Sequence, residues 1–135
     1  MAEKKQHYYY ALGRRKTATA RVRLMNGTGK VTVNGAELEQ FLDGSKSLTH
    51  DLYRPFDVLD LDRKKYDVSV VVAGGGQHGQ VGAIRLGIAK AMAIMNEDLK
   101  GSLRRAELLG RDPRKKERKK FGLKGARKQR QFTKR

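Results

Sequence analysis

The chain has 135 residues, enough for one domain with a modest hydrophobic core. Its 31 Lys and Arg against 14 Asp and Glu give a formal net charge of +17, which favours a polyanionic partner such as nucleic acid. The absence of cysteine excludes disulfides and thiolate metal sites, and no run of about 18 apolar residues, the length that spans a membrane, is present.

The first predicted elements are two strands separated by a basic segment. The tyrosines at its start favour a strand over Tyr8–Leu12, and Gly13–Lys16 is predicted to be a basic loop or bulge. Strict alternation over Thr17–Leu24 predicts a second strand with one buried and one exposed face. We expect Ala18, Ala20, Val22 and Leu24 to face the core, and Thr17, Thr19, Arg21 and Arg23 to face outward.

The next segment predicts a short strand and helical structure. After a turn at 26–29, Lys30–Val33 is predicted to be a strand. The apolar spacing over Ala36–Leu42 favours a short helix rather than the returning strand of a hairpin. Residues 44–65 suggest a helix or turn packed on the sheet and broken at Pro55.

The strongest elements lie in the second half of the chain. Tyr66–Ala73 is predicted to be a central strand, because it is apolar almost throughout, and three glycines end it. Gly79–Met95 is predicted to be a helix, and Glu97–Leu109 a second helix stopped by Gly110. The core stripe predicted for the first helix is Val81, Ile84, Ile88, Ala91 with Met92, and Met95.

The glycines between that strand and helix spell G-x-G-x-x-G at Gly74, Gly76 and Gly79. A dinucleotide site needs a second parallel strand after the helix, with an acidic residue near its end. Here Asn96-Glu97-Asp98 opens another helix instead, so an oxidoreductase is the weakest alternative. The loop can still bring backbone N–H groups and a helix N-terminus to a phosphate. For Gly82 and Gly87, close helix–sheet packing is the preferred explanation.

No arrangement of residues predicts catalysis or a metal site. The three histidines, His7, His50 and His78, are scattered and show no metal-binding spacing. The acids at 57–62 lie among cations and are typical of a solvated turn rather than of a carboxylate pair for acid–base chemistry. The sequence therefore predicts a protein that is not an enzyme, with no cofactor and no small-molecule substrate.

The last 25 residues are the most basic part of the chain. Residues 111–135 contain 13 Lys and Arg against two acids and few apolar side chains, so alone they should be disordered and should order on a polyanion. Asp112–Lys120 could form a brief helix with Asp112 as its N-cap and Pro113 in first position. We therefore divide the chain into a globular RNA-binding domain, 1–110, and a basic extended tail, 111–135.

Candidate phosphate-binding residues fall in three groups. Each group combines cations, or glycines that expose backbone amides, with a segment predicted to be at the surface. They are Arg14, Arg15, Lys16, Arg21 and Arg23 beside the first strands; Gly75, Gly76, Gln77, His78 and Arg85 at the glycine loop and helix; and Arg111, Arg114, Lys115, Arg118, Lys119, Lys120, Lys124, Arg127 and Lys128 in the tail.

Four blocks in order resemble the family of bacterial small-subunit ribosomal protein number nine. They are GRRKTATARVRL (Gly13–Leu24), VTVNG (Val31–Gly35), GGGQHGQVGAIRLGIAKA (Gly74–Ala91) and LLGRDPRKKERKKFGLKGARKQRQFTKR (Leu108–Arg135). The family tail usually ends Q-F-S-K-R. Here Thr133 keeps the hydroxyl of that serine, and Arg130 stands where proline is common.

The resemblance implies an α+β fold, a two-layer α/β domain with a mixed sheet and helices on one face, followed by a long extended basic C-terminal tail. It implies a structural role in the head of the cytoplasmic small ribosomal subunit, with small-subunit rRNA and neighbouring head proteins as partners and no membrane contact. It further implies that the tail reaches the anticodon stem-loop of the peptidyl-site tRNA through Lys134 and Arg135. The alternative is a free RNA chaperone or an architectural nucleic-acid-binding protein.

Overall fold

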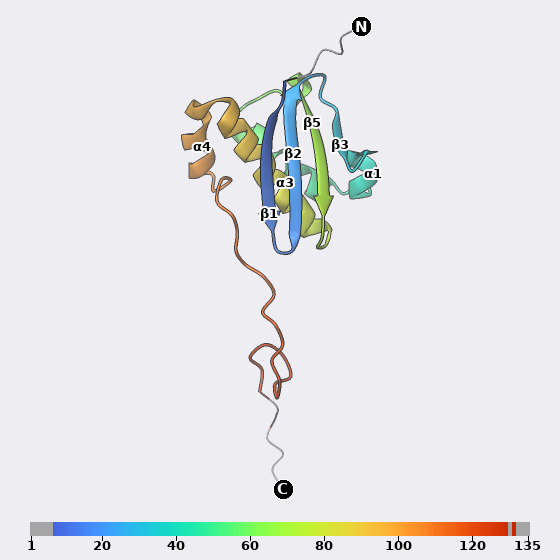
Figure 1. The fold of residues 1–135 in the computed structure, drawn as a ribbon, viewed down its shortest axis with the longest axis vertical. Coiled ribbons are helices and arrows are strands. Elements are labelled where there is room, and N and C mark those ends of the chain that lie inside the picture. Colours follow the sequence, from blue (N-terminus) through green and yellow to red (C-terminus); the bar gives the residue numbers. More distant parts are fainter. Residues whose placement is uncertain (1–6, 130, 132–135) are drawn as a thin grey trace.

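The computed structural model describes residues 7–129 and 131, and it is a mixed five-stranded sheet with helices packed on one face (Figure 1). The sheet order is β1-β2-β5-β3-β4, with β3 and β5 parallel and the other neighbouring pairs antiparallel. The predicted α+β class is confirmed. The elements are β1 (Tyr9–Arg15), β2 (Ala18–Asn26), β3 (Val31–Val33), β4 (Ala36–Glu37), α1 (Leu38–Leu42), α2 (Lys46–Val58), β5 (Tyr66–Ala73), α3 (Gln77–Met95) and α4 (Lys100–Arg105), with single 3₁₀ turns at Arg63–Lys65 and Glu97–Leu99.

The first two strands form a long hairpin. The alternation predicted for β2 is confirmed, since its alanines, Val22 and Leu24 are fully buried while Arg21 and Arg23 are exposed. The predicted basic loop at Gly13–Lys16 is wrong, because β1 continues to Arg15 and the turn is confined to Lys16 and Thr17. The strand can continue because Gly13, paired with Ala20, lets the hairpin approach α3 closely.

A second hairpin contradicts another prediction. Asn34 and Gly35 have positive φ angles of 52° and 81°, which form a tight turn that returns the chain into β4 before α1 begins. The Asn34 side chain then bridges to β5: its amide donates to the Val72 carbonyl at 3.0 Å, and its oxygen accepts from the Val72 amide at 2.9 Å. The predicted helix over Ala36–Leu42 therefore starts two residues later than expected.

Helix α2 runs through its proline. Ser45 caps it by accepting from the Leu48 amide, and the helix ends at Val58, so the predicted break at Pro55 is wrong. A proline removes one backbone hydrogen bond to the preceding helical turn. Burial of Pro55 and its neighbour Phe56 in the core offsets that loss.

The central strand and helix match their predictions, and the helix is buried more widely than a single stripe. Strand β5 has the predicted bounds, and α3 begins two residues before its predicted start. The predicted stripe is buried except for half-buried Met95. Residues on other faces, including Leu86 and Ala89, are also buried, because α2 and α4 pack against α3.

The segment after α3 ends differently from its prediction. The second helix stops at Arg105 rather than Leu109, because Glu107 takes a left-handed backbone conformation with a φ of 60°. The Leu108 amide then donates to the Leu103 carbonyl at 3.0 Å, which turns buried Leu108 back to the core. Gly110, predicted to stop this helix, has no such role.

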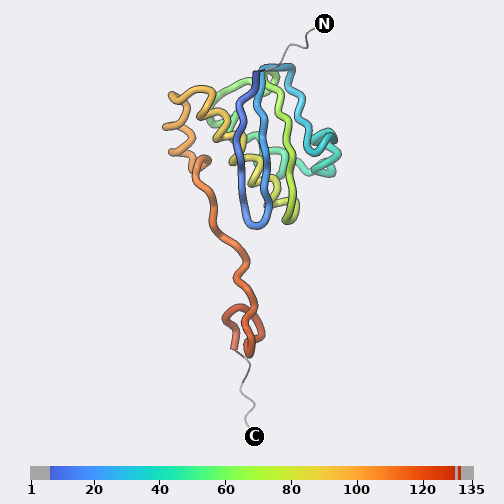
Figure 2. The backbone as a smooth tube through the Cα atoms, viewed as in Figure 1, coloured from blue at the N-terminus to red at the C-terminus, as the bar shows by residue number. Residues whose placement is uncertain are grey.

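The predicted helix over Asp112–Lys120 is also wrong. Asp112 does accept from the Arg114 amide at 3.0 Å, as an N-cap would, but residues 111–120 form neither helix nor strand. Residues 114–120 consist of six cations and one acid, Glu117, and the repulsion between the cations opposes a compact turn. The described part of this segment leaves the domain beside α4 (Figures 1 and 2).

One carboxylate holds the loop between β2 and β3. Asp67 Oδ1 accepts from the amides of Lys30, Thr28 and Gly29 at 2.9, 2.9 and 3.0 Å. The Lys30 amide contributes most to lowering the pKa of Asp67 below its usual range. A group with a lowered pKa stabilises the fold above its unfolded pKa and loses that effect as pH falls through its folded pKa.

We therefore expect Asp67→Asn to lower the free energy of unfolding at pH 7, because three backbone amides lose a charged acceptor. The loss should be only about 1 kcal/mol, because solvent weakens charge-assisted hydrogen bonds at a surface. The difference should begin to shrink below about pH 4, where the carboxyl of the unfolded chain becomes protonated, and should vanish at the lower pH where the folded-state carboxyl is protonated too. Thermal unfolding of both proteins from pH 7 to pH 2.5 checks this. A stability difference that stays constant across that range would contradict a role for the charge.

Candidate nucleic-acid interface

The sheet face away from the helices is basic and partly aromatic. Alternation along β1 and β2 places Tyr10 beside Arg23 and Arg14 beside Thr19 on this face. The Arg23 guanidinium also lies 5.0 Å from the ring centroid of Tyr8, a cation–π distance. The face thus offers separate cations among exposed rings, and Figure 1 shows no helix covering it.

Arg15 points to the opposite side of the sheet. A Cβ on Gly82 of α3 would lie 2.2 Å from Arg15 Cδ, so the arginine lies across the helix at this glycine. The five cations predicted beside the first strands therefore do not share one surface. Arg14, Arg21 and Arg23 lie on the open face, Lys16 lies in the turn, and Arg15 joins Arg85 on the helical side.

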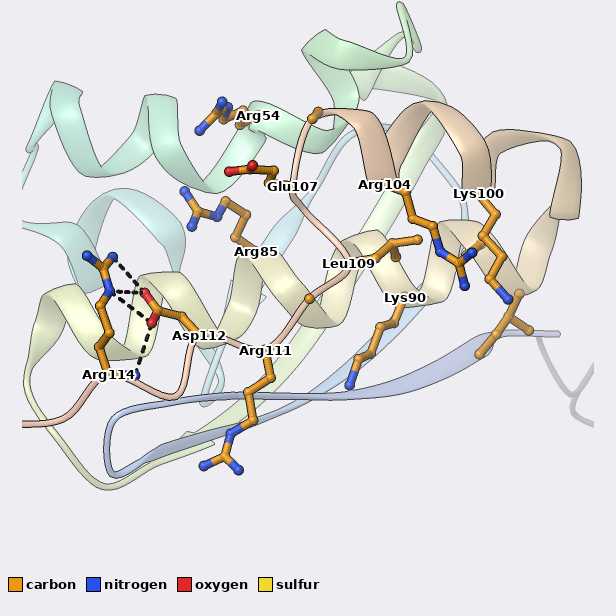
Figure 3. Close-up of a pocket in the computed structure, with 14 residues that line it drawn as sticks. Arg54, Arg85, Lys90, Lys100, Arg104, Glu107, Leu109, Arg111, Asp112 and Arg114 are labelled. Atoms are coloured by element: carbon orange, nitrogen blue, oxygen red, sulfur yellow. Dashed lines mark hydrogen bonds and ion pairs between the residues drawn. The ribbon is translucent and has the colours of Figure 1, made fainter.

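A basic groove lies between α2, α3, α4 and the start of the tail (Figure 3). Its volume is about 1110 Å³. Seven cations line it against two acids, Glu107 and Asp112, which gives the lining a strong positive charge. The cations are Arg54, Arg85, Lys90, Lys100, Arg104, Arg111 and Arg114.

The electrostatics of the groove are unfavourable for one half-buried cation, Arg85. Burial lowers the pKa of Arg85 most. The charges of Asp51 and, less strongly, Asp112 raise it, and those of nearby Arg15 and Arg54 lower it further. Asp112 forms an ion pair with Arg114, whose guanidinium donates to both carboxylate oxygens at 2.8 and 3.0 Å. That contact lowers the pKa of Asp112 to about 2. An anion in the groove would relieve the repulsion around Arg85.

The glycine loop packs against the tip of the first hairpin. Gly74 has a φ of 78°, and a Cβ there would lie 2.6 Å from the Thr17 carbonyl oxygen. The loop therefore sets the N-terminus of α3 beside the hairpin turn, and Lys16 Cδ would lie 3.7 Å from a Cβ on Gly79. Two predicted phosphate-binding segments that are about 60 residues apart in sequence thus meet in the fold.

The side chains of the loop have unequal freedom to bind a ligand. Gln77 Nε2 donates to the Phe41 carbonyl at 3.2 Å and so ties α3 to α1. His78 is exposed, and Gly75 and Gly76 are exposed at the helix start. No strand follows α3 among residues 7–129 and 131, so the second strand that a dinucleotide site requires is missing there.

Both glycines assigned to helix packing do lie at close contacts. A Cβ on Gly87 would meet Val22 Cγ2 of β2 at 2.4 Å, which confirms close helix–sheet packing at that position. At Gly82 the contact is the Arg15 side chain instead. The absence of a side chain at Gly82 therefore leaves room for the Arg15 side chain against α3, a role that the sequence did not indicate.

Four groove residues were missed from the sequence, namely Arg54, Lys90, Lys100 and Arg104. Lys100 and Arg104 are spaced i, i+4 and so share one face of α4, a signal that could have been used. Lys90 is a single cation in an apolar stretch of α3, and its ammonium donates to the Leu12 carbonyl on β1 at 3.3 Å. Nothing in the local sequence places Arg54 near them.

The remaining candidates lie in the tail. From Arg111 to Lys128 all of the predicted cations are exposed. Lys134 and Arg135 lie outside the described residues. Within the described ranges no cluster of three or more His, Asp or Glu could hold a metal ion. In the same part of the chain, no helix is long and apolar enough to cross a membrane.

Comparison with known proteins places these surfaces in a family context. A family model described as ribosomal protein S9/S16 matches residues 13–135. Curated relatives named small ribosomal subunit protein uS9 come from Ureaplasma parvum serovar 3, with 53% identity over 94% of each chain, and from Ureaplasma urealyticum serovar 10, with 52% identity over the same shares. The relative of that name from Malacoplasma penetrans is 48% identical over 94% of this chain and 96% of its own.

Proposed function

The chain belongs to the ribosomal protein S9/S16 family, and from this we propose that it binds small-subunit rRNA through the open sheet face, the basic groove and the tail. As a family member it is a structural constituent of the small subunit of the cytoplasmic ribosome and acts in translation. The family is a structural class of ribosomal proteins rather than an enzyme family.

The groove is the observation that carries the proposal. Arg85 is half-buried, and its burial together with the positive charges of Arg15 and Arg54 disfavours its charged form, which Asp51 offsets only in part. A phosphodiester in the groove would compensate the cations, and phosphate is the ligand that matches planar guanidinium groups. Arg104, Arg111 and Lys90 extend the same lining along the groove, so a backbone segment with several phosphates fits better than a single anion.

We expect Arg85→Gln to lower the affinity for protein-free small-subunit rRNA about tenfold, because one phosphate contact is lost. The slope of log K against log salt should flatten by about 0.7–0.9. The thermal midpoint of the free protein should stay equal or rise, because a poorly compensated cation is removed. Filter binding over a salt series and thermal unfolding measure the three quantities.

Lys65→Gln is the matched control, since it removes one exposed cation outside the groove. It should change affinity and slope less than Arg85→Gln does. Equal losses in the two variants would show that only net charge matters, and unchanged binding of Arg85→Gln would remove the groove from the interface.

Sedimentation separates this proposal from that of a free RNA chaperone. A structural constituent remains with small subunits through a high-salt wash, whereas a chaperone held by exposed charge dissociates as salt screens its contacts. Quantifying the protein in subunit fractions before and after the wash gives the answer.

The tip of the tail is proposed to contact the peptidyl-site tRNA. The support is the resemblance of the terminal block and the length of the tail, since 25 residues span at most about 80 Å when fully extended at ~3.3 Å each. Lys134 and Arg135 would add on the order of a few kcal/mol at most, partly screened by salt. This is small beside the total binding of tRNA, and it matters where initiation or reading frame is marginally held.

We therefore expect deletion of Thr133–Arg135 to leave subunit assembly intact and to raise frameshifting or lower initiation fidelity measurably. Frameshifting reporters in cells and tRNA binding to assembled subunits test this expectation. Blocked assembly together with unchanged tRNA affinity on assembled particles would make the tip an rRNA contact instead.

A further inference from the structure

The described tail contains a small closed loop between Glu117 and Lys128 (Figure 2). Glu117 makes ion pairs with Lys120 and with Arg127, ten positions further on, the latter at 3.0 Å. The Lys124 amide donates to the Lys128 carbonyl at 2.9 Å and closes the loop from the other side. One acid and one backbone contact thus fold a segment that consists mostly of cations.

The loop presents an aromatic ring to solvent. Phe121 is fully exposed, and the next residue, Gly122, turns the backbone with a φ of 82°. Three lysines, Lys119, Lys120 and Lys124, lie within three positions of Phe121 in the sequence. Exposure of a phenyl ring to water is unfavourable, and this ring lies on a turn fixed by ion pairs and next to several lysines. The arrangement indicates a ligand that has both a flat apolar surface and negative charge.

We propose that Glu117 folds this loop so that Phe121 stacks on an unpaired base of the small-subunit rRNA while the adjacent lysines contact its phosphates. The inference rests on the proposed function and adds base contact to it. Nucleobases are flat and apolar on their faces, and their phosphates match the lysines in charge, whereas an acidic protein surface would not supply the flat partner. A protein partner is an outcome that the test can distinguish.

Substitutions at Phe121 test stacking without disturbing the fold, because the ring is fully exposed and lies outside the core. With protein-free small-subunit rRNA as the probe, Phe121→Leu should bind about tenfold more weakly, and Phe121→Tyr should stay within about twofold of the wild type. The slope of log K against log salt should not change in either variant, since no charge is altered. Lys119→Gln should flatten that slope by about 0.7–0.9.

A direct readout is available because the chain has no tryptophan. In Phe121→Trp the indole would be the single such fluorophore, and stacking on a base should quench its emission on rRNA binding. Val58→Ala is the control, since Val58 is another large apolar side chain, 37% exposed at the end of α2 and outside the groove lining. It should leave rRNA affinity unchanged.

For Glu117, loop ordering and net charge predict opposite changes in rRNA affinity. Glu117→Gln raises the net charge by one, which alone would strengthen binding to RNA. If the carboxylate pre-organises the loop, the variant should instead bind about threefold more weakly, because ordering the loop then opposes binding. Glu97→Gln makes the same charge change outside the tail and should not weaken binding.

The outcomes separate this inference from the proposed function. If wild-type protein binds rRNA with a steep salt dependence while Phe121→Leu binds equally well, or Phe121→Trp is not quenched, stacking is overturned and the proposed function stands. If Glu117→Gln binds more tightly, pre-organisation of the loop is overturned. If Phe121→Leu retains rRNA affinity and loses only retention in assembled subunits, the ring contacts a neighbouring protein. Absence of salt-dependent binding by the wild type would overturn the proposed function itself.

Discussion

Replacement of Gly13 by alanine should cost the domain about 3 kcal/mol or more, and with it a large part of its stability. An added Cβ would lie 1.8 Å from the Ala83 carbonyl oxygen and 2.7 Å from the Gly87 amide nitrogen. Both obstacles are backbone atoms of α3, so no side chain can rotate away. The helix would have to move off the β1–β2 hairpin, which opens the packing between α3 and the sheet.

Thermal unfolding measures this effect directly. A loss of 3 kcal/mol in a domain of this size lowers the midpoint by roughly 15 °C. Gly101→Ala is the matched control, because Gly101 lies within α4 with open space at its Cβ position. That change should be neutral or stabilising through helix propensity. A Gly13→Ala midpoint within a few degrees of the wild type would show that the hairpin and helix can separate at little cost.

Removal of residues 111–135 should reduce rRNA affinity by orders of magnitude and should leave the domain folded. The truncated chain loses 13 of 31 basic residues, and with them most of its net charge. If several of these cations contact phosphates, the slope of log K against log salt should flatten by several units. The thermal midpoint should change little, because the described tail residues bury almost no apolar surface in the core.

A full-length variant separates charge from chain length. Replacing Lys115, Lys116, Lys119 and Lys120 by glutamine keeps the tail and should flatten the slope by about three units. A truncated protein with the wild-type slope would mean that the tail binds no phosphate, and the groove and sheet face would then carry the interaction.

Local pattern was sufficient where one residue type repeats with the period of its element. Alternation in β2 predicted both of its faces, and the apolar run of β5 predicted its bounds and its central place in the sheet. The pattern failed at element ends, where a single contact decides. The Asn34-Gly35 dipeptide is typical of a hairpin turn and indicates β4 rather than the helix start expected at Ala36, whereas nothing in the local sequence predicts the left-handed backbone of Glu107 that ends α4.

The sequence by itself determines the separation of this protein into an apolar core and a strongly cationic tail, and hence its class of partner. Charge density and periodicity are local quantities, so they need no contacts to be read. Only the tertiary structure decides that Arg15 turns to the helices while Arg14 stays on the open face, and that Arg54, Arg85 and Arg104 line one groove. Those placements depend on contacts between segments that are far apart in the chain, such as Gly13 against α3 and Arg15 against Gly82. Such contacts form only when the chain folds, so no local stretch of sequence predicts them.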